Sequence, residues 1–358
     1  MDRRHFLNLA GPALATVAYS PAMAASTDAP SSLQKLSAEL DQSLFAGDGL
    51  AFPIPDQPTI SPLAKGLDRA LVLGGGGTYY LAWYCGFFHG LFDEGIDAPE
   101  LADMIVGTSA GSYAGSSLAS GHFFRLRTEF EFFGHFPGLF ARLAPVSDPN
   151  LSQQRAQKIN AAAKDGSIAT RQAIGHAALA SDNKVNGEGV ERLAAFLTGD
   201  SKSAWTSGKM HTTAVDCYTG ERVVVSKASA DKNGIPLAHG AAASCSLPGI
   251  IGPTLLGQRY CMDGGMCSNA AHVDLVAGVK RALIITLNDG LQPPFLTGIP
   301  HPIAQNIQQI EAVGTKTMWI KADPPNVNLM DPKEVSAGLQ AGYDRAKKEA
   351  PAIKEFWV

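Results

Sequence analysis

The sequence predicts an α/β fold, in which buried strands alternate with helices around a central sheet. Two stretches predict it. The apolar residues 70–73 lead into four glycines and an apolar helix, and residues 104–106 turn directly into a second helix. Both are strand–turn–helix units, from which α/β domains are assembled. With 358 residues, 45% of them hydrophobic, the chain can bury one large core.

The charge of the chain argues against several classes of partner. Only 17% of the residues are charged, and the formal net charge is −4. A nucleic-acid binder carries a basic stripe, and a protein held electrostatically on anionic lipids carries a polybasic segment. The sequence shows neither, so we expect no nucleic-acid partner.

Residues 1–24 predict an export signal. Arg3-Arg4 followed by Phe6-Leu7 resembles the twin-arginine signal, and Ala22-Met23-Ala24 fits a cleavage site. The apolar run between them is too short to span a bilayer. An amphipathic N-terminal anchor is the alternative. A cleaved signal predicts a periplasmic or secreted protein.

Residues 25–68 predict an arm laid against the main domain, which we place at 69–358. Leucines follow at helical spacing between residues 33 and 44, and four prolines between 53 and 62 then break regular structure.

The glycine run Gly74–Gly77 lies between a strand and a helix, where backbone N–H groups can face a bound anion. A P-loop would need Gly-Lys at its end, and a dinucleotide loop would need a glycine where Tyr80 stands. We favour an oxyanion hole, because the next strand–helix corner along the chain carries a candidate nucleophile.

That nucleophile is Ser109, within Gly107-Thr-Ser-Ala-Gly111. The G-x-S-x-G pattern needs small residues around the serine because the turn is tight. The buried strand before Ser109 and the small-residue helix after it are the context in which this pattern is functional.

The segment 122–143 contains seven of the sixteen phenylalanines. We favour a helix packed on the core, since buried aromatic residues dominate cores. The alternative is a peripheral membrane contact through Phe123–Phe140.

The remaining chain predicts polar helices over 150–200, including an amphipathic pair of turns at 190–197, and further strands and helices after them. The strands are expected at 212–218, 222–226, 259–263, 282–287 and 318–321, and the helices at 241–247 and 334–348. The strand at 259–263 delivers Asp263 into a glycine turn, although Asp-Gly is also an ordinary turn dipeptide.

The five cysteines form no C-x-x-C, so no metal, redox or other cofactor site is predicted. We expect buried thiols, Cys85 above all. Two disulfides remain open for an exported protein.

Four motifs in this order resemble the patatin-like phospholipases: Gly74–Gly77, Gly107–Gly111, Ser244-Cys-Ser-Leu-Pro-Gly249, and Asp263-Gly-Gly265 with Asn269 and Asp274 after it. The resemblance spans about residues 69–345. It implies a three-layer fold with a mainly parallel central sheet flanked by helices.

The resemblance also implies an enzyme that cleaves carboxylic ester bonds of lipids, as a phospholipase A, a lysophospholipase or a nonspecific esterase. Ser109 would be the nucleophile of a Ser–Asp dyad and Asp263 its base. The oxyanion hole would comprise Gly75, Gly76 and Gly77, and an acyl-serine would form.

The chain departs from the family at Tyr79 and Tyr80, where a basic residue and a glycine are usual. This departure bears on head-group preference and on oxyanion geometry. Two alternatives follow. His272 or His301 could complete a Ser-His-Asp triad, as their place after Asp263 allows. An exported protein with an altered loop could instead bind lipid with little catalysis.

Overall fold

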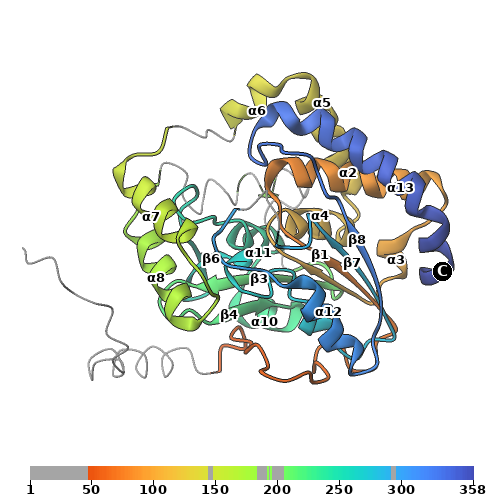
Figure 1. Ribbon diagram of the computed structural model, residues 1–358, viewed down its shortest axis with the longest axis horizontal. Helices are drawn as coiled ribbons and strands as arrows, with labels where there is room; N and C mark the ends of the chain where they lie inside the picture. Colours follow the sequence, from red (N-terminus) through yellow and green to blue (C-terminus); the bar gives the residue numbers. More distant parts are fainter. Residues whose placement is uncertain (1–46, 144–147, 184–191, 193, 196–204, 292–295) are drawn as a thin grey trace, which may run out of the picture. The chain divides into compact units, whose positions relative to one another are not determined.

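The computed structural model describes residues 47–143, 148–183, 192, 194–195, 205–291 and 296–358 (Figure 1). They belong to one compact unit, Asp41–Val358. The predicted export signal, the leucine-rich part of the arm and most of the segment 190–197 lie outside the described residues.

An eight-stranded sheet forms the centre of this unit, in the order β5-β6-β3-β2-β1-β7-β8, with β4 paired to β3. The neighbouring strands β3, β2, β1, β7 and β8 are parallel, whereas β4, β5 and β6 are antiparallel additions at one end. The strands are β1 Arg69–Leu73, β2 Met104–Gly107, β3 Met210–Asp216, β4 Arg222–Val225, β5 Thr254–Leu256, β6 Arg259–Asp263, β7 Arg281–Thr286 and β8 Lys316–Lys321.

Both faces of the sheet are buried, as in a parallel sheet covered by helices. Leu71 and Leu73 of β1 point into one core, and Ala70 and Val72 point into a second core on the opposite face. The side chains alternate because successive residues of a strand face opposite ways.

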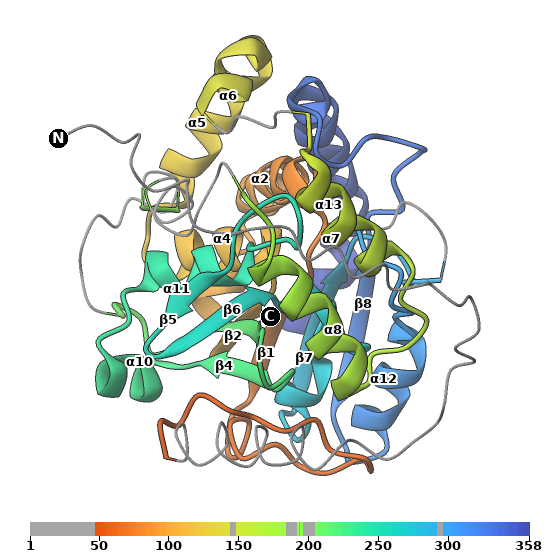
Figure 2. The ribbon, with the colours of Figure 1, turned by 90° about the vertical axis from the view of Figure 1, so that its left-hand side faces the viewer.

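The helices form the outer two layers (Figures 1 and 2). Four pack on the first face: α2 Gly77–Asp93, α4 Ala110–Ala119, α11 Leu237–Ser244 and α13 Val335–Trp357. The second face is covered by α12 Ile303–Glu311 and the 3₁₀ turn η2 Val273–Val276. The predicted three-layer α/β fold with a mainly parallel sheet is confirmed.

Other described helices lie around these layers. They are α3 Ala98–Leu101, α5 Phe123–His135, α6 Pro137–Leu143, α7 Leu151–Ala161, α8 Ile168–Leu179 and α10 Lys227–Asn233, with the short turns η1 Gly264–Met266 and η3 Pro332–Glu334. None of the helices among the described residues is long and apolar enough to cross a membrane.

The last helix is longer than the predicted 334–348, since α13 continues to Trp357 with Pro351 inside it. A proline removes one hydrogen bond from a helix. The turns beyond it are held by tertiary contacts: Trp357 is fully buried, and the side chain of Arg69 donates to its carbonyl oxygen at 2.8 Å.

The phenylalanine-rich segment is divided between the core and the surface. Phe123, Phe130, Phe133 and Phe140 are buried, whereas three others on α5 and just after it are exposed, namely Phe124 by 58%, Phe132 by 46% and Phe136 by 54%. Core packing therefore explains one face of this segment, and the other face is apolar and open.

All five cysteines are buried and unpaired. They lie in the apolar cores or beside buried polar groups, as expected of small hydrophobic side chains.

Candidate active site

Ser109 lies at the corner between β2 and α4, with φ 51° and ψ −121°. A non-glycine residue with positive φ is strained and persists only where its surroundings enforce it. Two residues later, position 111 must be glycine, because a Cβ there would lie 2.1 Å from the carbonyl oxygen of Leu73. The corner therefore presents the serine above the sheet end.

The glycine loop runs beside this corner and is fixed at its start. Gly74 donates its N–H to Ile285 at 3.0 Å, and the hydroxyl of Tyr84 donates to the carbonyl of Gly74 at 3.0 Å. A Cβ on Gly75 would lie 3.0 Å from the Cβ of Ser109, closer than an ordinary contact, so glycine favours this close approach of the loop.

Gly75 and Gly76 line the same pocket as Ser109. Within the described part of the chain, their N–H groups have no protein acceptor. Gly77 has φ +69°, begins α2 and packs against Leu329, outside the pocket lining. The structure thus brings two of the three predicted oxyanion residues to the serine.

Tyr79 and Tyr80, the departure from the family pattern, lie in the first turn of α2 and point into the core. They are only 2% and 0% exposed. The Tyr80 ring packs on that of Tyr84, with centroids 4.3 Å apart. The two tyrosines therefore pack in the core next to the glycine loop and add no charge to the pocket.

Asp263 ends β6 and is 3% exposed. Its Oδ1 accepts the N–H of Gly265 at 2.7 Å. Burial raises the pKa of Asp263 to about 6, against the lowering effects of the Gly265 N–H and the Ser109 hydroxyl. The carboxyl group is thus poised to exchange a proton near neutral pH.

The motif around Ser244 connects the two candidate catalytic residues. The Ser244 hydroxyl accepts the backbone N–H of Ser109 at 2.9 Å, and the Ser246 carbonyl accepts that of Asp263 at 3.0 Å. The thiol of Cys245, between them, is buried beside Ser112. The sequence pointed to this motif without a role, because its partners are distant in the chain.

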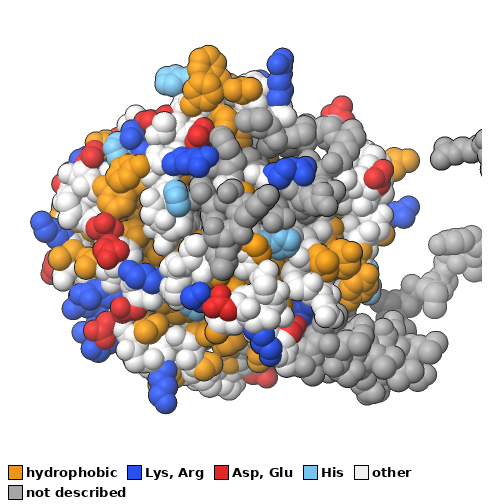
Figure 3. All heavy atoms as spheres, turned by 180° about the vertical axis from the view of Figure 1, so that it is seen from behind, with side chains coloured by type: hydrophobic (Ala, Val, Ile, Leu, Met, Phe, Trp, Pro, Cys, Tyr) orange, Lys and Arg blue, Asp and Glu red, His pale blue; other side chains and the backbone are white. Residues whose placement is uncertain are grey.

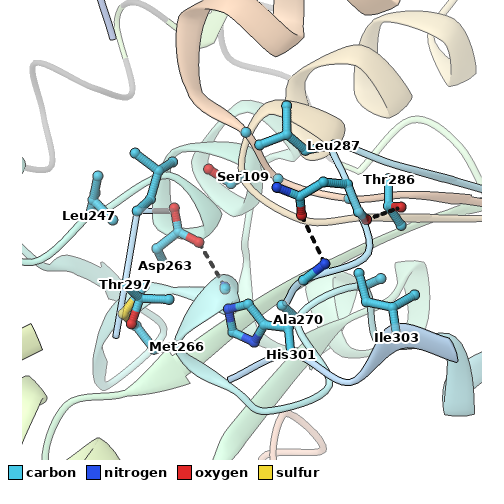
Figure 4. Close-up of a pocket in the computed structure, with 18 residues that line it drawn as sticks. Ser109, Leu247, Asp263, Met266, Ala270, Thr286, Leu287, Thr297, His301 and Ile303 are labelled. Carbon is cyan, nitrogen blue, oxygen red and sulfur yellow. Dashed lines mark hydrogen bonds between the residues drawn. The ribbon is translucent and has the colours of Figure 1, made fainter. Parts of the chain in front are cut away.

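Figure 4 shows the pocket, with the Ser109 hydroxyl close to the Asp263 carboxylate. Its wall is mainly apolar and includes Leu247, Met266, Leu287, Leu296 and Ile303. A second hollow beside α7 shares Leu247, Leu296 and Thr297 with it, so the two hollows adjoin.

The two histidines of the triad alternative are placed differently. His301 lines the pocket, and burial lowers its pKa to about 4, so its ring is neutral at pH 7. His272 is fully buried outside the pocket lining, with Nε2 3.0 Å from the carbonyl oxygen of Gly264. Among the described residues, no hydrogen bond joins either ring to Ser109.

No group of three or more potential metal ligands occurs among the described residues.

A parallel α/β sheet with a serine at a strand–helix elbow defines the class of α/β proteins with a nucleophile elbow. The sequence model of the family described as patatin-like phospholipase matches residues 71–275, more than half of the chain. The chain belongs to this family, whose name points to hydrolysis of lipid acyl esters.

Solved structures with similar folds include VipD from Legionella pneumophila, with 13% identity and a TM-score of 0.41 over 80% of this chain and 67% of that one. ExoU in the ExoU–SpcU complex from Pseudomonas aeruginosa has 14% identity and a TM-score of 0.34 over 82% of this chain. The chain spans about half of ExoU, 52% of its length. A search of curated proteins returned no match. The family assignment rests on the sequence match.

Proposed function

We propose that this protein is a serine acyl hydrolase that cleaves lipid esters with Ser109 as nucleophile and Asp263 as its base. One observation carries the proposal. Two strands far apart in the sequence, β2 and β6, deliver these side chains to one pocket, under the N–H groups of Gly75 and Gly76.

In the first half of the reaction, Asp263 takes the hydroxyl proton of Ser109 as Oγ attacks the ester carbonyl carbon. The carbonyl oxygen becomes an oxyanion facing Gly75 and Gly76, where one preorganised donor contributes about 3 kcal/mol. When the tetrahedral intermediate collapses, the C–O bond to the alcohol breaks, and the alcohol leaves with the proton from Asp263.

In the second half, Asp263 takes a proton from water, whose oxygen attacks the acyl-serine carbonyl. Collapse breaks the bond to Oγ, Ser109 regains a proton from Asp263, and the carboxylic acid departs. A serine hydroxyl needs such a base because it is a weak nucleophile by itself. A carboxyl pKa near 6 suits this task, since a general base works best near the operating pH.

The substrate class is an ester with an apolar acyl chain, of the phospholipase A, lysophospholipase or nonspecific esterase type. The apolar wall of the pocket and the second hollow that adjoins it support this choice. The acyl chain would extend from Ser109 past Leu247 toward α7.

The test is hydrolysis of a p-nitrophenyl ester series of increasing acyl length by the wild type and Ser109→Ala. We expect the variant to lose at least about a thousandfold in kcat, as expected when a nucleophile is removed. We also expect a fluorophosphonate probe to label only the wild type. Activity retained in Ser109→Ala would contradict the proposal. Failure of the probe to label the wild type would favour a lipid-binding protein instead.

We further propose that the exposed apolar face of α5 and α6 touches a lipid surface. Phe124, Phe132, Phe136 and Leu139 form this face, each at least 40% exposed. Figure 3 shows apolar side chains at the top of the view, where α5 and α6 lie. Clustered exposed apolar side chains are typical of membrane or partner contacts.

A further inference from the structure

We propose that His272 is a positioning residue for Asp263, because its ring N–H holds the peptide group that hydrogen-bonds the catalytic carboxylate. This inference rests on the proposed Ser–Asp dyad and adds a residue that acts through another.

The contact is a chain of hydrogen bonds across one peptide plane. Nε2 of His272 lies 3.0 Å from the carbonyl oxygen of Gly264. The same peptide unit carries the N–H of Gly265, which donates to Oδ1 of Asp263 at 2.7 Å. A peptide group is planar, with its C=O and N–H pointing in opposite directions. Whatever fixes the oxygen therefore also aims the N–H at the carboxylate.

The structure also decides which ring nitrogen of His272 carries the proton. Nδ1 lies 3.4 Å from a guanidinium nitrogen of Arg222, which can only donate. Arg222 is fixed by a two-pronged ion pair with Asp274, at 2.7 and 2.8 Å. Nδ1 must then accept, and the proton lies on Nε2, facing the Gly264 carbonyl.

His272 is neutral at pH 7. Burial, followed by the positive charge of Arg222, holds its pKa well below the usual value. The other charged or titratable groups that act on the ring are Arg171 of α8 and His301, which lower its pKa as well. Asp274 on η2 pairs with Arg222. Nε2 carries a proton both in this neutral tautomer and in the protonated ring, so the donor is present in either state.

The backbone of His272 shows that its placement is enforced. The residue is fully buried and has φ 52°, in the left-handed region that few non-glycine residues adopt. Its N–H donates to the carbonyl of Asn269 at 2.9 Å, and the Asn269 amide donates to Asp274 at 2.8 Å. The loop around Asn269 and Asp274 thus holds the histidine against the catalytic turn.

Loss of the His272 donor should raise the pKa of Asp263. The Gly265 N–H favours the ionised carboxylate and lowers the Asp263 pKa. A less well-aimed peptide lowers it less, so the Asp263 pKa rises and the acid limb of activity moves to higher pH. The groups that face Asp263 itself are the Ser109 hydroxyl, the Cys245 thiol and the Tyr113 hydroxyl, and all remain unchanged.

The test compares His272→Gln with His272→Met in the full-length protein. Both side chains are unbranched and similar in size, but only glutamine offers an N–H donor. For His272→Met we expect a shift of the acid limb of kcat/KM by up to about one pH unit, and a fall in kcat of about tenfold with KM little changed. For His272→Gln we expect the acid limb of kcat/KM to lie within a few tenths of a pH unit of the wild-type limb.

A control separates this effect from the removal of any histidine. His176→Ala removes an exposed histidine of α8 and should leave the limb unchanged. Equal acid limbs in wild type and His272→Met, or equal shifts in Met and Gln variants, would overturn the positioning role. If His272→Met does not fold, a shifted acid limb in a folded His272→Gln still overturns the role. The dyad itself is judged separately, by Ser109→Ala.

Discussion

At the scale of single residues, Asp263 shows how one environment sets both chemistry and stability. Burial disfavours its charged form, whereas the Gly265 N–H and the Ser109 hydroxyl favour it, and burial prevails. The result is a carboxyl group with a pKa of about 6 in place of the usual 3.8. A group tuned in this way is a better base near neutral pH and a poorer contributor to folding.

We predict that kcat/KM for a soluble ester rises tenfold per pH unit below about pH 6 and levels off above it, because Asp263 must be ionised to accept a proton. The measurement is a pH profile between 4.5 and 8 in a buffer series of constant ionic strength. An acid limb centred near pH 4 would show that the pKa of Asp263 is not raised in the folded enzyme.

Asp263→Asn should be inactive but more stable than the wild type. Between pH 3.8 and 6 the unfolded chain releases the Asp263 proton while the folded protein keeps it, so rising pH favours unfolding. Asparagine does not titrate and can still accept the Gly265 N–H. The stability gain should grow from near zero at pH 4 to about 3 kcal/mol at pH 7. Urea unfolding at both pH values measures it, and a gain independent of pH would contradict the assignment.

At the scale of elements, the packing of α13 against α2 helps to fix the position of the glycine loop. α2 begins at Gly77, the last residue of the glycine run, and its aromatic side chains pack in the core next to that run. The two helices approach so closely that a Cβ on Gly342 would lie 2.0 Å from the carbonyl oxygen of Trp83. The position of the glycine loop therefore depends on a helix at the other end of the chain.

Gly342→Ala should lower the free energy of unfolding by about 1–3 kcal/mol, because backbone must move to admit the methyl group. Gly138→Ala is the matched control on α6, where a Cβ meets nothing within 4 Å. There, alanine should be neutral or stabilising by up to about 1 kcal/mol, since it favours helices. Chemical unfolding midpoints compare the two, and equal effects would refute the close approach.

At the scale of the whole described unit, the apolar face of α5 and α6 is the candidate contact with a lipid surface. The double change of Phe132→Ser and Phe136→Ser should weaken binding to phosphatidylcholine–phosphatidylglycerol vesicles at least about tenfold, since each buried phenylalanine contributes about 1.5–3 kcal/mol. Hydrolysis of a soluble short-chain ester should not change.

The control for this experiment is Leu151→Ser, which removes an apolar side chain on α7 that is 82% exposed. Vesicle sedimentation should be unaffected in that variant. If the double phenylalanine variant sediments with vesicles as the wild type does, α5 and α6 do not form the lipid contact.

Local sequence patterns predicted most of the fold but not several of its details. The strands around 70–73 and 104–107 and the serine corner could be predicted because apolar runs and small turn residues act over a few neighbours. The extension of α13 past Pro351 could not, because it depends on burial of Trp357. The placement of Gly77 outside the pocket was missed because glycines of one run look alike in sequence.

The sequence by itself determined the fold class, the family and the candidate catalytic pair, since ordered short motifs carry that information. Only the tertiary structure decided how they meet. The sheet order places Asp263 close to Ser109, and burial raises the pKa of Asp263. Ser244 and Ser246 hydrogen-bond the backbone N–H groups of Ser109 and Asp263, and His272 contacts the turn after Asp263 through the Gly264 carbonyl. These relations depend on strand pairing and burial between distant segments, which no local pattern encodes.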